Sequence, residues 1–233
     1  MSGYEWGNDP EFFGPQMYYR TTRMLLTLKR YISRGKVLDA GCGDGVLSFR
    51  LVRAGYTVTA ADAAVQCVAY IERKIRMQRL EKSMNAQKID LARLPFAAKS
   101  YDGVTCGEVL EHIQDDVSVV KQFFRVLKPG GICVITTPGK PHLWHEIDDI
   151  SGHVRRYTIH ELKKKFTQAG FDVLKCYYWG FPINGLWHRL VFKPLILAKI
   201  RSKTNITRSR GVIAGLLKAA HIQRLASMIF DVD

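Results

Sequence analysis

The segment VLDAGCGDGVLSF, residues 37–49, ends an apolar run with an aspartate and then places a glycine at every second position, at Gly41, Gly43 and Gly45. Glycine has no Cβ and tolerates positive φ, so this spacing predicts a sharp turn where the backbone closely approaches another group. The dinucleotide fingerprint GxGxxG has a different spacing and binds a pyrophosphate, whereas Asp44 inside this loop would repel a phosphate. A loop that mixes backbone donors with carboxylates instead suits a ligand carrying positive charge.

Acidic residues also follow the next apolar runs. Asp62 ends TVTAAD, and Asp90 with Leu91 follows the run MNAQKI. In doubly wound folds a ligand lies beyond the carboxyl ends of the strands, where a carboxylate after the second strand accepts hydrogen bonds from ribose hydroxyls. Asp90 and Leu91 are placed where an adenine amino group and ring would be met. Asp39, Asp62, Asp90 and Leu91 lie at or directly after the ends of the first three expected strands, in chain order. Together they predict a cofactor site at the carboxyl edge of the sheet.

Three more ionisable residues occur in GEVLEHI, residues 107–113. In a helical conformation Glu108, Glu111 and His112 would share one face within a single turn. Three interpretations stay open. The carboxylates could merely favour a helix N-terminus, with His112 in a structural role. The three groups could bind a divalent metal such as Mg, Mn or Zn, or His112 could act as a general base without a metal.

The elements that position these residues alternate between strand and helix. Apolar runs predict strands at residues 36–40, 57–62, 84–90, 101–110, 132–138 and 171–180. Helical spacing predicts helices at residues 16–32, 46–55, 64–79, 114–127 and 158–170, the last with Thr158 and Glu161 as a capping box. This alternation predicts an α/β fold with a doubly wound, Rossmann-like, mostly parallel sheet. Residues 139–152 do not fit the alternation and are expected to form a loop-like insert.

We expect three parts in the chain: an N-terminal helical lid segment at 1–34, a cofactor-binding domain at 35–180 with a substrate-side insert at 139–157, and a basic, apolar C-terminal extension at 181–233. In the insert, Arg155 and Arg156 could meet an anionic group of a substrate or pair with Asp148 and Asp149.

Composition narrows the class of protein further. The 233 residues include 35 Lys+Arg against 21 Asp+Glu, which gives a net charge of +14. This excess favours binding to phosphates, anionic lipid surfaces or an anionic ligand; the alternative is that the basic residues only form a solvated surface. The five scattered cysteines indicate a reducing compartment. The N-terminus lacks a signal-peptide pattern and no apolar stretch is long enough to span a bilayer. We therefore expect a soluble, cytoplasmic protein whose C-terminal extension could contact a membrane peripherally.

From Gly35 to Phe171 the chain resembles the class I S-adenosylmethionine-dependent methyltransferases, in particular the methyltransferase type 11 subgroup related to the ubiquinone-pathway enzymes. The resemblance rests on VLDAGCGDG, ADAA, DLARLPFAAKSYDGVTCGEVLEHI, RVLKPGGICVITTP and RYTIHELKKKFTQAGF. It implies S-adenosylmethionine as cofactor, whose cationic sulfonium suits a loop rich in carboxylates. The cofactor-binding set that it implies is Asp39, Gly41, Cys42, Gly43, Asp62, Ala63, Asp90, Leu91 and Glu108.

The motif ExxEH is similar to that of two methyltransferase groups that use a divalent metal, the ubiquinone-pathway O-methyltransferases and the enzymes that methylate the 3′-terminal 2′-hydroxyl of small RNAs. The resemblance implies a metal at Glu108, Glu111, His112 and His153, the last three also being the expected catalytic residues. His142 and His145 are alternatives to His153 as ligand or base.

The acceptor that we expect is a hydroxyl on a small molecule, aromatic or lipophilic. An RNA 2′-hydroxyl is the alternative, disfavoured because no RNA-binding module is visible. Metal-independent N- or C-methylation with a histidine base is another alternative. A non-catalytic cofactor-binding partner is disfavoured, because a scaffold has no evident use for three clustered ionisable groups.

Overall fold

The computed structural model describes residues 15–179, and residues 21–176 belong to the first of two compact units into which the chain divides. The elements in chain order are α1 (Pro15–Tyr31), β1 (Lys36–Ala40), α2 (Val46–Arg53), β2 (Thr57–Asp62), α3 (Val65–Gln78), β3 (Met84–Lys88), η1 (Leu91–Arg93), β4 (Tyr101–Gly107), η2 (Leu110–His112), α4 (Asp116–Val126), β5 (Leu127–Thr136), η3 (Pro141–Leu143), α5 (Glu146–Ser151) and α6 (Ile159–Gln168).

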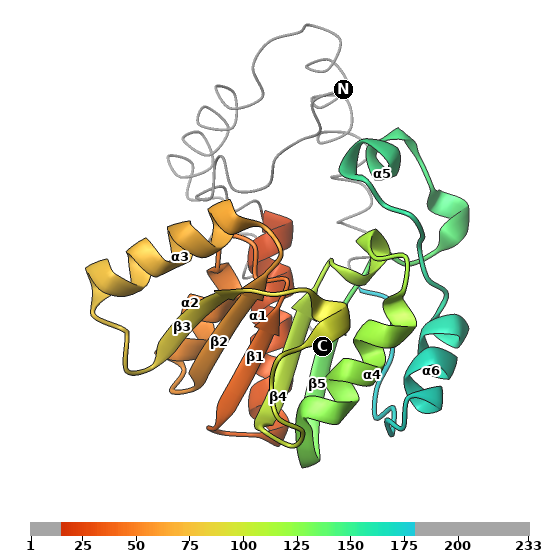
Figure 1. The fold of residues 1–233 in the computed structure, drawn as a ribbon. Helices are drawn as coiled ribbons and strands as arrows, with labels where there is room; N and C mark the ends of the chain where they lie inside the picture. Colours follow the sequence, from red (N-terminus) through yellow and green to blue (C-terminus); the bar gives the residue numbers. More distant parts are fainter. Residues whose placement is uncertain (1–14, 180–233) are drawn as a thin grey trace, which may run out of the picture. The chain divides into compact units, whose positions relative to one another are not determined.

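The five strands of this unit form one sheet in the order β3-β2-β1-β4-β5 (Figure 1). Every neighbouring pair is parallel, which confirms the predicted doubly wound α/β fold. The chain runs outward from β1 in one direction to β3 and then returns to β4 on the other side of β1. The carboxyl ends of β1 and β4 therefore flank the point where the strand order reverses, which is where such sheets bind ligands.

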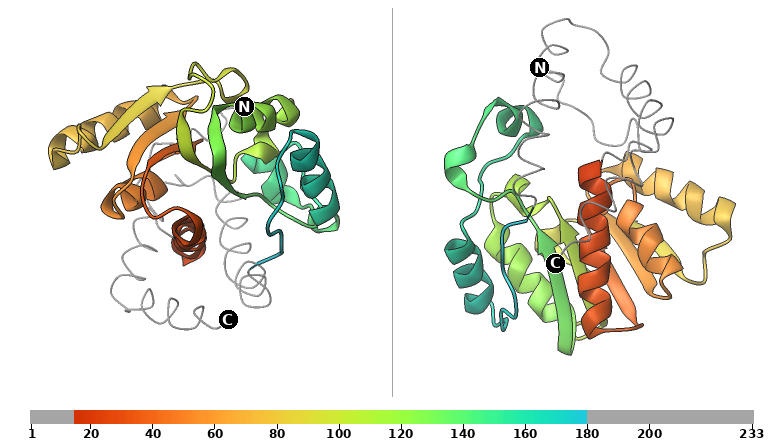
Figure 2. Two further views of the ribbon diagram at one scale, coloured as in Figure 1. Left: turned by 90° about the horizontal axis from the view of Figure 1, so that it is seen from below. Right: turned by 180° about the vertical axis from the view of Figure 1, so that it is seen from behind.

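Alternate residues of the strands bury their side chains on opposite faces of the sheet. Val37 and Val58 belong to the apolar cluster that includes residues of α1, α2 and α3. Leu38 and Val104 belong to the cluster that includes residues of α4 and α6. Figure 2 shows these two groups of helices on the two sides of the sheet. Because both faces are covered at the centre of the sheet, β1, β2 and β4 are buried over most of their length, whereas the edge strand β3 is largely exposed.

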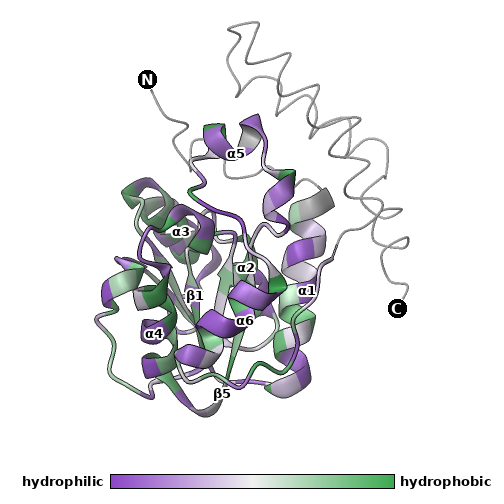
Figure 3. Cartoon of the chain, turned by 90° about the vertical axis from the view of Figure 1, so that its right-hand side faces the viewer, coloured by the Kyte–Doolittle hydropathy of each residue, from purple (hydrophilic) through white to green (hydrophobic). Residues whose placement is uncertain are grey.

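The ends of helices α4 and α6 are fixed by side-chain caps. Asp115 accepts a hydrogen bond from the backbone N–H of Ser118 at the start of α4. Thr158 and Glu161 form the predicted capping box at the start of α6. Figure 3 shows hydrophilic residues on the outer side of α6, as expected for a helix that buries only one face. These caps fix the two helices that follow the candidate site residues in the chain.

Three predicted elements differ from the structure. Residues 171–179 form no strand; Leu174 and Tyr178 are exposed, so this run lacks the buried face that would favour pairing. The strand expected at 132–138 instead begins at Leu127, with Pro129, Gly130 and Gly131 in a bulge, because β4 pairs Tyr101 with Leu127 but Gly103 with Ile132. The insert at 139–152 is partly helical, since it contains η3 and α5.

The second compact unit is described only at residues 15–20 and 177–179, where the rings of Tyr19 and Trp179 lie 5.3 Å apart. The C-terminal extension at 181–233 and residues 1–14 of the expected lid segment lie outside the described residues, so the expected domain boundaries and membrane contact stay predictions. Within residues 15–179, no helix has the length and apolar character that a bilayer span requires.

Candidate functional site

The glycine loop between β1 and α2 has a left-handed backbone. Gly41 and Gly43 have φ of +73° and +53°, a region that residues with a Cβ rarely adopt. The N–H of Gly41 donates to the carbonyl of Ala61 at 2.7 Å, which ties the loop to the end of β2. The predicted sharp turn is therefore present at the carboxyl edge of the sheet.

The two glycines differ in what lies against them. A Cβ added at Gly43 would meet nothing within 4 Å, which leaves open space for a ligand beside the main chain. A Cβ added at Gly41 would lie 2.3 Å from Cγ2 of Val109, a residue of the GEVLEHI segment after β4. The sequence predicted a close approach at Gly41, and the group that approaches is the side chain of Val109. This contact packs the glycine loop against the segment that follows β4.

Asp39 faces the protein interior. Its side chain is 3% exposed, and its carboxylate accepts hydrogen bonds from the hydroxyls of Ser48 at 2.5 Å and Thr105 at 2.8 Å. These bonds link β1 to α2 and to β4 below the glycine loop. The structure therefore gives Asp39 a part in holding the loop, and its expected contact with the cofactor stays a prediction.

Asp62 holds the same loop from the neighbouring strand. Its Oδ2 accepts from the N–H of Gly43 at 2.8 Å and its Oδ1 from the N–H of Ala64 at 2.9 Å. A carboxylate has about four acceptor sites, so this one can still take bonds from a ribose diol. Ala63, beside it, is exposed. Asp62 thus both shapes the loop and stays available to a cofactor.

The remaining expected cofactor residues lie on either side of the loop. Asp90 is exposed and caps η1 by accepting from the N–H of Ala92 at 2.9 Å, while Leu91 is buried. Burial, with smaller contributions from Asp39 and Asp62, raises the pKa of the Cys42 thiol well above its usual value. Cys42, which lies within the loop between Gly41 and Gly43, is therefore an uncharged thiol near pH 7.

The segment after β4 does not continue as the helix that would place all three ionisable residues on one face. Glu108 has φ of +58°, and its N–H donates to the carbonyl of Thr136 at the end of β5 at 2.8 Å. The chain then forms the short helix η2 at Leu110–His112. Glu108 therefore lies in a left-handed turn before η2, outside the helix that would place it on one face with Glu111 and His112, and its expected role as a metal ligand stays a prediction.

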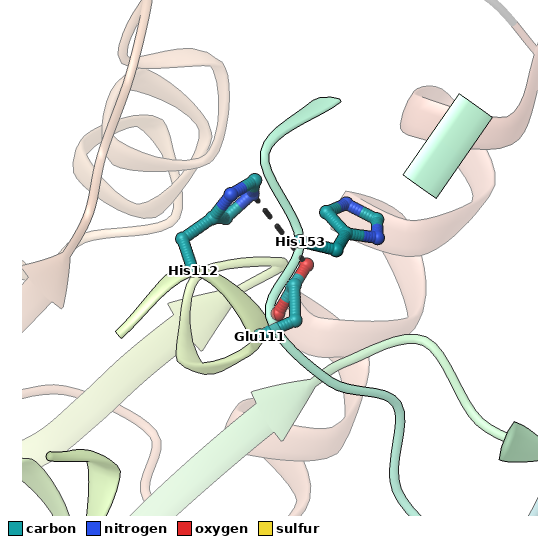
Figure 4. Close-up of side chains that lie close together, drawn as sticks. All are labelled: Glu111, His112 and His153. Atoms are coloured by element: carbon teal, nitrogen blue, oxygen red, sulfur yellow. Dashed lines mark ion pairs between the residues drawn. The ribbon is translucent and has the colours of Figure 1, made fainter. Parts of the chain in front are cut away.

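Glu111, His112 and His153 do come together (Figure 4). Each offers one ligand atom, and these atoms all lie within 4.8 Å of one another. The Glu111 side chain is fully buried, and its Oε2 accepts from the hydroxyl of Thr137 at 3.1 Å. Figure 4 shows the carboxylate below the two imidazole rings, whose centroids lie 4.8 Å apart and which come from segments far apart in the sequence. Three of the four expected ligands are thus neighbours, and Glu108 is not among them.

His112 is held in a defined orientation. Its Nδ1 lies 3.3 Å from the carbonyl oxygen of Gly152, which can only accept, so the neutral ring carries its proton on Nδ1. Its Nε2 then presents a lone pair and lies 4.0 Å from Oε1 of Glu111. Burial, and next the neighbouring His153, lower the pKa of His112. The ring is therefore neutral near pH 7 and can act as a ligand or a base.

The insert is tied to this cluster by its backbone and by one buried carboxylate. The N–H of Val154 donates to the carbonyl of Glu111 at 2.8 Å. Asp148, 1% exposed, contacts Nδ1 of His153 at 2.8 Å and Nδ1 of His145 at 3.2 Å. His142 is exposed in η3. His153 is therefore the insert histidine that joins Glu111 and His112, while His142 and His145 are not in that cluster.

The two arginines of the insert are engaged in ion pairs within the chain. Arg156 pairs with Asp148, and Arg155 pairs with Asp116 at 3.0 Å. Asp149, an expected partner, instead accepts from the indole N–H of Trp144 at 3.1 Å. These contacts favour the pairing alternative over an anionic substrate group, although the partner of Arg155 is one that the sequence did not indicate.

Sequence reasoning missed Thr137, the hydroxyl that binds the Glu111 carboxylate. It also treated Asp148 only as a partner for an arginine. The one signal for Thr137 was its position directly after β5, at the same sheet edge as the other site residues. Nothing in the spacing indicated the role of Asp148, because its partners are brought together by the fold of the insert.

A doubly wound sheet with these site residues at its carboxyl edge defines a class I S-adenosylmethionine-dependent methyltransferase. A family model described as a methyltransferase domain matches residues 16–175, and the chain belongs to that family. Among curated proteins, the ubiquinone biosynthesis O-methyltransferase of Psychrobacter cryohalolentis is 37% identical over 103 residues, which cover 44% of this chain and 40% of the relative. The matched part is thus less than half of that relative's length.

Solved methyltransferase structures share the fold. Burkholderia thailandensis 1,6-didemethyltoxoflavin-N1-methyltransferase, with bound 1,6-didemethyltoxoflavin and S-adenosylhomocysteine, matches with a TM-score of 0.58 and 21% identity, covering 71% of this chain and 73% of that one. Haemonchus contortus phosphoethanolamine N-methyltransferase 2, in complex with S-adenosyl-L-methionine, matches with a TM-score of 0.65 and 18% identity, covering 88% and 49%. At these identities the likeness concerns the fold alone.

Proposed function

We propose that this methyltransferase transfers the methyl group of S-adenosylmethionine to a hydroxyl oxygen of a small acceptor. The observation that carries the proposal is the cluster of Glu111, His112 and His153. Two of these residues belong to the segment after β4 whose Val109 lies against Gly41 of the glycine loop. The printed name of the curated relatives, an O-methyltransferase, supports oxygen as the acceptor atom.

The cofactor supplies a methyl group that is already activated on a sulfonium, so the protein must position the reactants and favour deprotonation of the acceptor. In this proposal Asp62 accepts from the ribose diol, and the open space at Gly43 lets the cofactor lie against the main chain. Asp90 and Leu91 meet the adenine at the end of β3. The cationic sulfonium then lies close to carboxylates, which stabilise its charge.

The cluster fits a divalent metal. One carboxylate and two imidazoles are a donor set that zinc-, manganese- or magnesium-like ions use, and His112 is neutral, as a ligand must be. Glu111, His112 and His153 would hold the ion. When bound, it would act as a Lewis acid that lowers the pKa of the acceptor hydroxyl. We leave Glu108 out of this ligand set because it is not among the three groups whose ligand atoms lie within 4.8 Å of one another.

Without a metal, the same residues could still serve proton transfer. The lone pair of His112 Nε2 faces Glu111, and a neutral imidazole can accept a proton from a hydroxyl. Burial lowers the pKa of His112, so the ring stays a free base at neutral pH. The metal and the base are therefore alternatives for one step, and a binding measurement separates them.

The insert supports a lipophilic acceptor. Leu143, Trp144 and Ile150 are 50%, 38% and 49% exposed, although each is large and apolar. They belong to the segment that also supplies His153, so an apolar acceptor could cover them while its hydroxyl reaches the cluster. We propose a small aromatic or lipophilic hydroxyl compound as the substrate class.

The test is calorimetric titration of Mg²⁺, Mn²⁺ and Zn²⁺ into the protein loaded with S-adenosylhomocysteine. Wild type is expected to bind one of these ions stoichiometrically, and Glu111→Gln, which keeps the side-chain volume but removes the charge, is expected to lose that binding. Asp149→Asn is the matched control, because it makes the same change at an exposed carboxylate of α5 and should bind as wild type does. If wild type binds none of the three ions, the metal is withdrawn and His112 becomes the candidate base.

The acceptor atom needs its own assay. Transfer of a labelled methyl group to catechols and to lipophilic phenols should be detected, with the label on oxygen. Label found only on nitrogen or carbon acceptors would refute O-methylation. Transfer to a 3′-terminal RNA hydroxyl, with binding that weakens steeply as salt rises, would instead support the RNA alternative.

A further inference from the structure

Asp148 is the most heavily bonded side chain of the insert. Besides the two histidine rings, its carboxylate accepts from Nε of Arg156 at 2.7 Å, from Nη2 of Arg156 at 2.8 Å and from the backbone N–H of His145 at 2.9 Å. The group is thus a buried carboxylate that only accepts.

An acceptor of this kind decides where the neighbouring ring carries its proton. A neutral imidazole has one N–H, and the nitrogen that faces a carboxylate must be the one that donates. For His153 that nitrogen is Nδ1, at 2.8 Å from Asp148 Oδ1. Its Nε2 is then left with the lone pair. For His112, the 3.3 Å contact of Nδ1 with the carbonyl oxygen of Gly152 favours the same tautomer, since Nε2 lies 4.0 Å from Oε1 of Glu111, beyond hydrogen-bond distance.

We propose that Asp148 is a positioning residue of the active site, which fixes the tautomer and orientation of His153 so that its Nε2 lone pair serves the Glu111 and His112 cluster. Arg156 donates to both oxygens of the carboxylate, including the Oδ1 that contacts His153, and so holds it in place. Ligand histidines whose second nitrogen donates to a carboxylate gain basicity and a fixed orientation. The effect on metal binding rests on the proposed function, but the tautomer does not.

The experiment is nitrogen-15 NMR of the histidine rings at a pH where they are neutral, with His153→Gln used to assign the signals. Wild type is expected to show His153 protonated on Nδ1. In Asp148→Asn an amide N–H₂ replaces one carboxylate oxygen, while the Arg156 guanidinium and the backbone N–H of His145 around this position can only donate. The His153 signals are therefore expected to move to the Nε2–H tautomer or to a mixture of the two.

Arg156→Lys separates positioning from simple support of the insert. It also disrupts the two-pronged ion pair with Asp148, but it leaves the carboxylate that accepts from His153. The Nδ1–H tautomer is expected to persist in this variant and in the control Asp149→Asn. A His153 protonated on Nε2 in wild type would overturn the proposal, and this holds even if Asp148→Asn does not fold. An unchanged tautomer in Asp148→Asn, or an equal change in Arg156→Lys, would also overturn it.

Metal affinity provides the functional readout. Loss of a carboxylate that supports a ligand histidine costs about 10- to 100-fold in affinity, so Asp148→Asn is expected to lower the affinity for the ion by that factor, and Arg156→Lys is expected to lower it less. If wild type binds no metal, the metal alternative of the proposed function has failed, while the tautomer shift still tests the role of Asp148. If wild type binds metal and Asp148→Asn binds it equally well with an unchanged tautomer, the positioning role alone has failed.

Discussion

Replacing Gly41 with alanine tests why the loop has a glycine at this position. The new Cβ would lie 2.3 Å from Cγ2 of Val109, and the backbone would have to keep φ near +73°. The left-handed conformation costs a residue with a Cβ about 1–2 kcal/mol, and overpacking of this kind costs about 1–3 kcal/mol more. Gly41→Ala should therefore lower the free energy of unfolding by about 2–5 kcal/mol.

A double-mutant cycle with Val109→Ala divides this cost into its two parts. Truncating Val109 removes the two methyl groups nearest to the new Cβ and leaves the Val109 Cβ at 3.2 Å, so the backbone strain is most of what remains. Gly41→Ala is then expected to cost about 1–2 kcal/mol in the Val109→Ala background, which is a coupling energy of about 1–3 kcal/mol. Gly43→Ala is the matched control, because its Cβ meets no atom within 4 Å and its cost should not depend on residue 109.

The assay is urea unfolding followed by circular dichroism, with the free energy taken from linear extrapolation. Calorimetry with S-adenosylhomocysteine on the same variants shows whether the loop still binds the cofactor product. A coupling between positions 41 and 109 below about 0.5 kcal/mol would mean that they act independently. That result would refute the contact with Val109 as the reason for glycine at position 41.

Two further predictions concern Asp62 and His112. Asp62→Ala removes the acceptor of the Gly43 N–H and the proposed ribose ligand, so calorimetry should show S-adenosylhomocysteine binding weakened by at least tenfold, about 1.4 kcal/mol; unchanged affinity would exclude the ribose contact. The pKa of His112 is lowered on folding, so the folded protein binds fewer protons than the unfolded chain below about pH 6.5. Its free energy of unfolding should fall as the pH drops through this value, and less so in His112→Asn; equal slopes in urea unfolding would contradict this.

The sheet and the cofactor loop could be predicted because their signals are local. Apolar runs with aspartates at their ends mark strands that are buried on both faces, and alternate glycines mark a left-handed loop. The five strands and the helices between them follow these signals. The capping box at Thr158 and Glu161 was predictable for the same reason, since both partners lie in one turn.

The arrangement around Glu108 was not predictable from spacing. The expected shared face assumed an α-helix from residue 108 onward, but the N–H of Glu108 donates to Thr136 on the neighbouring strand. This bond holds Glu108 in a left-handed turn and starts the short helix at Leu110. This hydrogen bond joins the residue after β4 to the end of β5, 28 positions later in the chain, so no local sequence pattern indicates it. The joining of His153 to Glu111 and His112 depends in the same way on the fold of the insert.

The central strand pair has a consequence for how the protein folds. The hydroxyl of Thr105 reaches the carboxylate of Asp39 across 66 positions of sequence, and β1 pairs with β4 over the same separation. Parallel pairs this far apart close slowly, because a long loop must be ordered before any contact compensates for it. The glycine loop follows β1, and Glu111 and His112 follow β4. The cofactor loop and the ionisable cluster are therefore not brought together until these two strands have paired. We therefore expect cofactor affinity to emerge only in the last phase of refolding.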